Sequence, residues 1–402
     1  MTVMKIGIVC PYNMINVAGG VQQQVEHLYE NLKQRGHDVK IITPRPVGYK
    51  GTVPKNYILL GSSTKFNPFN PAMATTGTWT FDVDDDITKS IFEQEKFDVL
   101  HFHEPWAPLL GRHILQHSEA AHVGTFHANL IDTIAGKSIV NTFGPYGRGI
   151  AYKMHVLTAV SPAPAALFLN KNPEEELVKN IKYIPNGIDL KKYQTKPRLA
   201  LKHPKMKTIL YVGRLEGRKG PKYLLKAFAD LAIRNKKVQL LIAGTGPDEK
   251  KLRDMVAELE IPRVTFLGYI SDKDKIHYLH RADVFCSPAT HGESFGIVLL
   301  EAMAAGCPIV AGDNIGYQSV MKDIGAISLV NPRDIVDFSR RLELMVFNED
   351  LRRIWRNWAD SYVKQFDYPK VVDQYLEVYK EAIAIHEKQP KAKSRFSLRR
   401  QS

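Results

Sequence analysis

Residues 291–306 read HGESFGIVLLEAMAAG, and they follow Val284–Pro288, a short β-rich apolar run. The run predicts a buried strand, the glycine-containing residues after it predict a loop, and the apolar residues from about Gly296 onward predict a helix. Open α/β sheets bind ligands outside the carboxyl ends of their strands. The order of strand, loop and helix therefore predicts an α/β fold with a ligand site at this loop.

Two glutamates give this stretch a specific chemistry. Glu293 lies near the expected helix tip at Ser294–Gly296, where free backbone N–H groups suit a diphosphate. At a rise of about 1.5 Å per residue, Glu301 lies roughly 12 Å further along the helix. A nucleotide sugar running alongside the helix would place its sugar at Glu293 and its ribose at Glu301. The alternative is two unrelated acids, but the glycines and the strand before them favour a site.

The rest of the chain repeats this alternation of β-rich runs and amphipathic helical patterns. Such a βαβ rhythm predicts parallel sheets covered by helices, and it restarts after residue 207. Lys191–Lys207 is rich in Lys, Arg and Pro and predicts a connector, so the 402 residues divide into two sheet domains. The expected strands are Ile6–Cys10, Val39–Pro44, Val99–His103, Val123–Phe126, Thr208–Val212, Val238–Ala243 and Val264–Leu267, and the expected helices are Val21–Arg35, Lys222–Arg234, Asp248–Leu259 and Val371–His386.

Composition places the chain among ordinary globular proteins, with 44% apolar and 24% charged residues. No apolar run approaches the roughly 20 residues that cross a bilayer. The N-terminus runs into the β-rich Lys5–Cys10 without a signal-peptide layout. The three cysteines, Cys10, Cys286 and Cys307, have the spacing of neither a disulfide framework nor a zinc site. We therefore expect a cytoplasmic protein with reduced, buried cysteines.

The net charge of +13 implies an anionic partner: nucleotide phosphates, an anionic membrane face or nucleic acid. Lys391–Arg400 contains five basic residues and no acid, together with Phe396 and Leu398. Such a segment can associate with anionic lipids, or it can be a solvated tail. No zinc-finger or RNA-stacking motif is recognisable, so a nucleic-acid partner is not expected.

The run Gly213–Gly220 holds four charged residues between glycines, directly after an expected strand. Breaking a glycosidic bond to a diphosphate leaves negative charge on the phosphate, and fixed cations such as Arg214 and Lys219 stabilise it in the transition state without a metal. The alternative is a solvated basic turn. Asp84–Asp86 match an Asp-x-Asp metal pattern, but they precede Ile87–Phe92 and are better explained as a capped helix start.

Gly19 and Gly20 lie between the first strand and the first helix. Two glycines there let the backbone approach a phosphate at a helix N-terminus, although a simple turn would read the same way. The dinucleotide fingerprint Gly-x-Gly-x-x-Gly is absent from this place, which argues against a nicotinamide enzyme.

His127 follows the strand Val123–Phe126, and strand ends are site positions in this architecture. It is the best candidate for a catalytic histidine, with a hydrogen-bonded structural role as the alternative. His101, His103 and Glu104 could be read as a zinc cluster, but no third well-spaced ligand is evident.

These motifs resemble those of the retaining glycosyltransferases of the GT-B fold, glycosyltransferase family 4. The resemblance implies two Rossmann-like, doubly wound parallel-sheet domains that face a cleft. Residues 1–187 and 362–385, a returning C-terminal helix, would form the acceptor-binding domain, residues 188–361 the donor-binding domain, and residues 386–402 a basic tail. The matching segments are Cys10–Tyr12, Gly19–Gln22, Phe97–Pro105, Thr125–His127, Ile184–Gly187 and Glu293–Ala305.

The resemblance also implies roles for individual residues. The Gly19-Gly20 loop would approach the donor diphosphate, and Arg214 and Lys219 would hold it. Glu293 would contact the sugar and Glu301 the ribose. His127 would lie near the reaction centre and the acceptor. Further donor-binding residues would be Ser294, Phe295, Gly296 and Ile297, and further acceptor-binding residues would be Tyr12, Asn16 and Gln22.

The reaction implied is the transfer of a hexose, mannose from GDP-mannose as first choice, to an acceptor hydroxyl with an α linkage. Neither a metal nor another cofactor is expected. The acceptor would be lipid-linked, for example of phosphatidylinositol type, or a small polyol, and the protein would be peripheral at the inner face of the cell membrane. The alternatives are a transferase that uses UDP-glucose or UDP-N-acetylglucosamine, a nucleotide-sugar epimerase and a phosphorylase.

Three departures from the family pattern concern mainly the acceptor. Residues 60–90 contain only Lys65 and Lys89 as basic residues, where an arginine pair is expected near a phosphoinositide head group. Asn16 replaces an expected acid, and the Arg214–Lys219 turn is one residue shorter than usual. The resemblance is therefore a firmer guide to the donor than to the acceptor.

Overall fold

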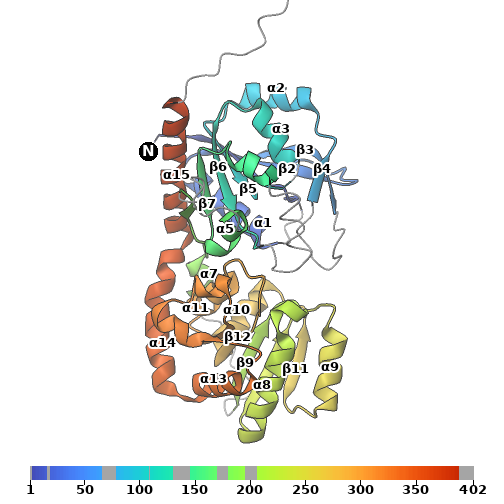
Figure 1. The fold of residues 1–402 in the computed structure, drawn as a ribbon, viewed down its shortest axis with the longest axis vertical. Helices are drawn as coiled ribbons and strands as arrows, with labels where there is room; N and C mark the ends of the chain where they lie inside the picture. The colour runs from blue at the N-terminus through green and yellow to red at the C-terminus, as the bar shows by residue number, and fades with distance from the viewer. Residues whose placement is uncertain are drawn as a thin grey trace, which may run out of the picture.

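A computed structural model describes residues 2–15, 19–65, 78–107, 109–129, 145–169, 180–194 and 206–388. They form two lobes, stacked one above the other in Figure 1, and each lobe is a β-sheet covered by helices. The expected architecture of two mainly parallel α/β sheets is confirmed. Asn16, residues 66–77 and the basic stretch Lys391–Arg400 lie outside the described residues.

The N-terminal lobe contains an eight-stranded sheet with the order β4-β3-β2-β1-β5-β6-β7-β8. Neighbouring strands are parallel except β3 and β4. β5, β6 and β7 are buried throughout, as parallel strands covered on both faces are. The elements are β1 (Lys5–Val9), α1 (Gly20–Gln34), β2 (Asp38–Pro46), β3 (Tyr57–Lys65), β4 (Thr78–Phe81), α2 (Asp85–Glu95), β5 (Val99–His103), α3 (Leu110–His117), β6 (Ala121–Phe126), β7 (Val156–Ala159), α5 (Pro162–Leu169) and β8 (Lys182–Tyr183).

The C-terminal lobe contains a six-stranded, wholly parallel sheet with the order β11-β10-β9-β12-β13-β14. Its elements, with the short α7 that leads into it, are α7 (Leu190–Gln194), β9 (Lys207–Val212), η1 (Gly217–Lys219), α8 (Pro221–Arg234), β10 (Val238–Ala243), α9 (Glu249–Glu258), β11 (Val264–Gly268), α10 (Asp272–Arg281), β12 (Val284–Ser287), α11 (Ile297–Ala304), β13 (Ile309–Gly312), α12 (Ile315–Gln318), η2 (Asp323–Ser328), β14 (Leu329–Val330), α13 (Ile335–Phe347), α14 (Glu349–Tyr362) and η3 (Val363–Phe366).

The strand order reverses at an equivalent place in both sheets. β1 lies between β2 and β5 in the first sheet, and β9 lies between β10 and β12 in the second. A crevice forms outside the carboxyl ends of the strands at such a switch point. Site residues are therefore expected on the loops after β1, β5, β6, β9 and β12.

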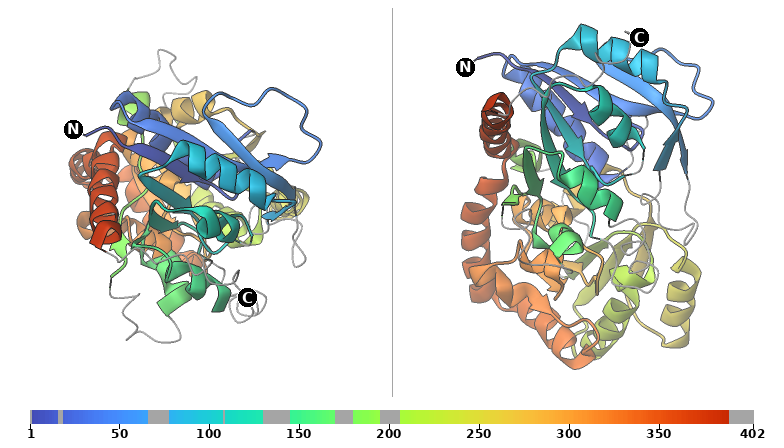
Figure 2. Two further views of the ribbon diagram at one scale, coloured as in Figure 1. Left: turned by 90° about the horizontal axis from the view of Figure 1, so that it is seen from above. Right: turned by 45° about the horizontal axis from the view of Figure 1, so that its top comes forward.

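The C-terminal helix α15 (Tyr368–Lys388) returns to the N-terminal lobe and runs along one side of the molecule in Figures 1 and 2. An apolar face of α15 joins the core of that lobe. At the crossing, Ile188 N–H donates to the Phe366 carbonyl at 2.8 Å and Tyr368 N–H donates to the Ile188 carbonyl at 3.1 Å. The helix begins earlier than predicted because Pro369 fits its first turn, where a missing N–H costs no hydrogen bond.

Two local expectations are confirmed. The Asp84 carboxylate accepts the Ile87 N–H at 2.9 Å, so Asp84–Asp86 form the start of α2. Cys10, Cys286 and Cys307 are buried free thiols. Of the helices in the described part of the chain, none combines the length and apolar character needed to cross a membrane.

Candidate functional site

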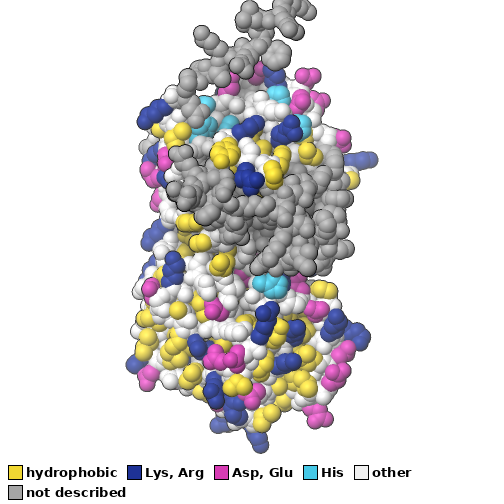
Figure 3. Space-filling view, in the orientation of Figure 1, with side chains coloured by type: hydrophobic (Ala, Val, Ile, Leu, Met, Phe, Trp, Pro, Cys, Tyr) yellow, Lys and Arg dark blue, Asp and Glu magenta, His cyan; other side chains and the backbone are white. Residues whose placement is uncertain are grey.

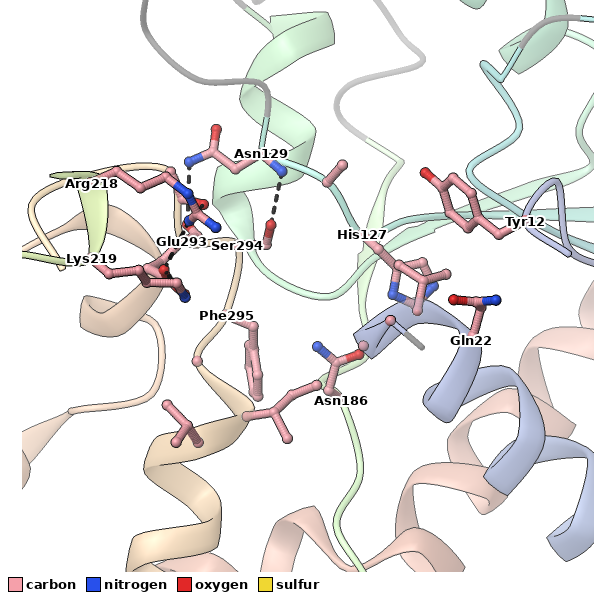
Figure 4. A pocket seen from close by; sticks show the side chains of 18 residues that line it. Tyr12, Gln22, His127, Asn129, Asn186, Arg218, Lys219, Glu293, Ser294 and Phe295 are labelled. Carbon is pink, nitrogen blue, oxygen red and sulfur yellow. Dashed lines mark hydrogen bonds and ion pairs between the residues drawn. The ribbon is translucent and has the colours of Figure 1, made fainter. Parts of the chain in front are cut away.

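A cavity of about 380 Å³ lies between the lobes. Figure 4 shows Arg218, Lys219 and Glu293 gathered on one side of it and the His127 side chain on the other. Arg214 and Glu301 are absent from its lining, and Asn16 is outside the described residues. The predicted site residues that line it are Tyr12, Gly19, Gly20, Gln22, His127, Lys219, Glu293, Ser294, Phe295, Gly296 and Ile297, and the other lining residues are Val21, Ala128, Asn129, Asn186, Arg218, Gly292 and Val298.

The loop before α11 takes its shape from two glycines. Gly292 and Gly296 have φ angles of 74° and 105°, a left-handed region that side chains disfavour. A Cβ atom on Gly296 would lie 2.7 Å from Cδ1 of Tyr317. This compact turn places the N-terminus of α11, which has no side-chain cap, at the cavity.

The Glu293 carboxylate is paired with two cations. Its Oε1 lies 2.6 Å from Lys219 Nζ and 3.2 Å from Arg218 Nη1. The Glu293 side chain is only 10% exposed, so solvent screens these ion pairs less than it screens a surface pair. The predicted residues Lys219 and Glu293 thus lie in direct contact.

Arg218, rather than Arg214, is the arginine at the cavity. Its Nη1 donates to the Gly292 carbonyl at 3.2 Å, and its Nε lies 2.7 Å from Glu216 Oε1. The Arg214 side chain is 42% exposed, and its Nε lies 3.6 Å from the other Glu216 oxygen. Sequence reasoning missed Arg218, although it lies next to Lys219 in the same glycine-framed run.

The position of this turn depends on Gly220. Gly220 has a φ angle of 72°, and a Cβ atom on it would lie 2.0 Å from the Pro288 carbonyl oxygen. The turn therefore packs closely against the end of β12. A hydrogen bond of 2.9 Å from Thr290 N–H to the Arg218 carbonyl fixes it further. These contacts bring Arg218 and Lys219 to the loop that carries Glu293.

Glu301 lies on α11 outside this cavity. Its Oε1 accepts the Tyr193 hydroxyl at 2.8 Å and the Lys275 ammonium at 2.6 Å. Burial and the Glu301 charge raise the pKa of Tyr193. Its contact with a ribose stays a prediction.

His127 lies at the end of β6 with its ring buried. Its Nε2 is 2.8 Å from Nδ1 of His103, and the two rings stack with their centroids 5.0 Å apart. Burial lowers the pKa of His127 to about 4, although a hydrogen bond with the Asn186 side chain acts in the opposite direction. His127 is therefore neutral near pH 7.

His101 continues this row of rings into the lobe. Its Nδ1 lies 2.8 Å from the Tyr379 hydroxyl on α15, and its Nε2 lies 2.6 Å from the Thr125 hydroxyl. Burial lowers its pKa to about 3. Both ring nitrogens of His101 therefore have hydrogen-bond partners within this lobe.

Glu104, which the sequence suggested only as part of a possible zinc cluster, is a buried acid that contacts the backbone of His127. Its Oε1 accepts the N–H of His127 at 2.9 Å and also that of Ala128, and its Oε2 accepts the indole N–H of Trp106. Its backbone is in the left-handed region, with a φ angle of 52°. Burial raises the pKa of Glu104 to about 7, although these hydrogen bonds oppose the shift.

Ser294 joins the two lobes. Its hydroxyl accepts the Asn129 N–H at 2.8 Å, and its carbonyl accepts the Ser161 hydroxyl. The Asn129 amide also donates to the Glu293 carbonyl at 3.2 Å. The loop after β6 and the loop before α11 therefore form one continuous wall of the cavity.

Two family profiles match the chain. The family described as Glycosyltransferase Family 4 matches residues 18–192. The family described as Glycosyl transferases group 1 matches residues 194–361. The matched segments correspond to the N-terminal and C-terminal lobes.

Individual relatives agree with these profiles. The chain is 35% identical over 379 residues to phosphatidyl-myo-inositol mannosyltransferase of Mycolicibacterium smegmatis, covering 94% of this chain and 93% of that protein. It is 34% identical to the protein of the same name from Mycobacterium tuberculosis, covering 94% of this chain and 96% of that protein. Sucrose-phosphate synthase from Thermosynechococcus elongatus has a similar structure, with a TM-score of 0.73 at 20% identity over 95% of this chain and 99% of that chain. This last likeness is one of fold, and it supports the expected GT-B arrangement.

Proposed function

The chain belongs to glycosyltransferase family 4, and we propose that it transfers mannose from GDP-mannose to a hydroxyl group of an inositol lipid, with an α linkage and retained configuration. The observation that carries this proposal is the 35% identity over 94% of the chain to an enzyme named phosphatidyl-myo-inositol mannosyltransferase. The residues around the cavity supply groups suited to both halves of such a reaction.

The C-terminal lobe would bind the donor. Arg218 and Lys219 lie together at the cavity, next to the start of α11. When the bond from the sugar to the diphosphate breaks, these fixed cations would stabilise the charge on the leaving phosphate. The diphosphate would replace Glu293 as their partner. The released Glu293 carboxylate could then accept hydrogen bonds from sugar hydroxyls.

The chemical step needs no side chain as a base. The acceptor oxygen bonds to the anomeric carbon on the face that the diphosphate leaves, the bond from that carbon to the phosphate oxygen breaks, and the hydroxyl proton passes to the leaving phosphate. Burial lowers the pKa of His127 to about 4, so we assign it contact with the reacting groups rather than proton transfer. We propose that the reaction requires no metal, because Arg218 and Lys219 neutralise the leaving group.

The surface charge supports a nucleotide phosphate as partner over nucleic acid. On the face that Figure 3 draws, Lys and Arg side chains are interspersed with Asp and Glu on both lobes, rather than gathered in one stripe. The net charge of +13 also fits an anionic membrane face, where an inositol lipid would be met. We therefore propose a peripheral position at such a surface.

The proposal is tested with the full chain, a panel of sugar donors and a panel of acceptors. GDP-mannose, UDP-glucose and UDP-N-acetylglucosamine are each offered with phosphatidylinositol vesicles, free myo-inositol or no acceptor, with and without EDTA. We expect an α-mannosyl lipid from GDP-mannose and vesicles only, unchanged by EDTA. Thermal unfolding with GDP, UDP and ADP gives an independent readout, because a nucleotide at 100 times its Kd adds about 2.7 kcal/mol.

Other outcomes would assign the activity differently. Transfer from a UDP-sugar would show that the donor is not GDP-mannose, and transfer to free inositol would show that the acceptor is not the lipid. A β-linked product would refute retention. An altered sugar nucleotide formed without any acceptor would identify an epimerase.

A further inference from the structure

His103 is a buried histidine that the proposed mechanism does not use. It ends β5, directly behind His127, whose side chain Figure 4 shows at the cavity beside Gln22 and Asn186. The His103 ring lies between two others, with centroids 4.2 Å from His101 and 5.0 Å from His127. This stacking leaves the ring little freedom to turn.

The contact between His103 and His127 can hold only one proton. Nδ1 of His103 and Nε2 of His127 are 2.8 Å apart, so one nitrogen donates and the other accepts. Burial lowers the pKa of both rings below the usual value, so each is neutral and carries a single N–H. Two arrangements remain, and they differ in where His103 carries its proton.

The other nitrogen of His103 distinguishes them. His103 Nε2 is buried and has no hydrogen-bond partner among the described residues. A void lined in part by His103 measures about 10 Å³, the lower limit for a single water molecule. A buried N–H without a partner is rarer in proteins than an unpaired acceptor. The proton of His103 therefore belongs on Nδ1, where it is donated to Nε2 of His127.

This arrangement determines what His127 can do. With Nε2 accepting from His103, the proton of the neutral His127 ring is on Nδ1. The Asn186 side chain hydrogen-bonds the same ring and also lines the cavity. Because Nε2 is taken by His103, the Asn186 side chain meets the Nδ1–H of His127, so a substrate oxygen would share or replace that contact, and the ring has no free lone pair with which to accept a proton.

We propose that His103 is a positioning residue that fixes His127 as its Nδ1–H tautomer and so makes His127 a hydrogen-bond donor to an oxygen of the bound substrates. The inference rests on the proposed function for the identity of those substrates. The tautomer itself does not depend on any activity. Its test can therefore fail independently of the proposed glycosyl transfer.

The direct test is a two-bond ¹H–¹⁵N correlation spectrum of the full chain with ¹⁵N-labelled histidine. His127 is assigned by the signals that disappear in His127→Gln. We expect His127 to show the Nδ1–H pattern and to lose it in His103→Leu, which removes the donor. An Nε2–H pattern in the parent protein, or an unchanged pattern in His103→Leu, would overturn the proposal.

Activity gives the second readout. His103→Leu should lower kcat roughly 10- to 100-fold, the cost of losing a hydrogen bond to charged or reacting groups. His103→Asn, whose amide can donate from near the Nδ1 position, should restore most of it. The matched control is His122→Asn, another buried histidine of the same sheet, which is bonded to Ser118 and Lys153 and should leave kcat unchanged. Equal losses in His103→Asn and His103→Leu, with both folded, would count against the donor role.

Discussion

The two lobes place different chemistry at the same cavity. The C-terminal lobe contributes ion pairs, with Lys219 and Arg218 on Glu293. The N-terminal lobe contributes buried neutral rings, with His127 in contact with His103. Fixed charges suit a diphosphate that gains charge as its bond breaks, whereas neutral hydrogen-bonding groups suit a hydroxyl acceptor. Substitutions in the donor half and in the acceptor half of the site should therefore have different effects on the protein.

The largest effect should follow from removing the ion pair of the C-terminal lobe. Lys219→Ala and Glu293→Ala should each lower kcat roughly 10²- to 10³-fold, because each removes a group that acts on the leaving phosphate or the sugar. The measurement is turnover of GDP-mannose at saturating acceptor. Lys250→Ala is the control, since this lysine is 88% exposed and pairs with Asp254 on the same helix. Near-normal rates in both Lys219→Ala and Glu293→Ala would contradict the proposal that this lobe binds the donor.

The second effect is the dependence of stability on pH, which should arise in the N-terminal lobe. Burial lowers the pKa of His122 from 6.5 to about 4. Between these values the unfolded chain binds a proton that the folded chain excludes, so this contribution is intact above pH 6.5 and is lost as the pH falls toward 4. We expect His122 alone to remove about 2–3 kcal/mol of unfolding free energy between pH 7.5 and 4.5.

Glu104 should act in the opposite direction. Burial raises its pKa from 4.5 to about 7, so the folded chain retains a proton that the unfolded chain releases, and stability is lost as the pH rises through this range. His101 and His127 titrate in the same sense as His122, so three buried histidines oppose the single carboxyl of Glu104. The net slope should therefore follow the histidines.

The free energy of unfolding is measured by urea titration between pH 7.5 and 4.5. Hydrogen–deuterium exchange reports the stability of each lobe separately. The loss should appear in the N-terminal lobe, because His277 and His291 in the other lobe are only half-buried. In His122→Asn, the free energy of unfolding should depend less steeply on pH than in the parent protein. If the curves of the variant and the parent run parallel, burial of His122 does not exclude its proton.

The sequence predicted well that the loop before α11 lies at the cavity, because its signal is local. Strand β12, the glycine loop and α11 follow one another within residues 284–304, so residue order alone placed Glu293 at the helix tip. The turn after β9 was also located from its charges and glycines. The sequence favoured Arg214 in this turn, whereas Arg218 lines the cavity, because the choice depends on the packing of Gly220 against Pro288, a contact between distant segments.

The N-terminal lobe was harder to predict because its site is assembled across strands. Glu104 reaches His127 only because β5 and β6 are neighbours, with His103 opposite Thr125. His101 meets Tyr379 because α15 returns from the end of the chain. The sequence located the ends of β5 and β6 and placed His127 at one of them, but it carried no sign of which side chains would meet there.

The smallest effect should separate the two arginines of the turn. Arg218→Gln should lower kcat/KM for the donor about tenfold, because Arg218 lines the cavity and contacts Glu293, whereas Arg214→Gln should lower it less than about threefold. The two substitutions are matched, since both residues lie in one turn and pair with opposite oxygens of Glu216. The measurement is kcat/KM for GDP-mannose, together with the Kd of GDP. A larger loss in Arg214→Gln would restore the assignment made from the sequence, and it would mean that Arg214 leaves Glu216 and turns into the cavity when the diphosphate binds.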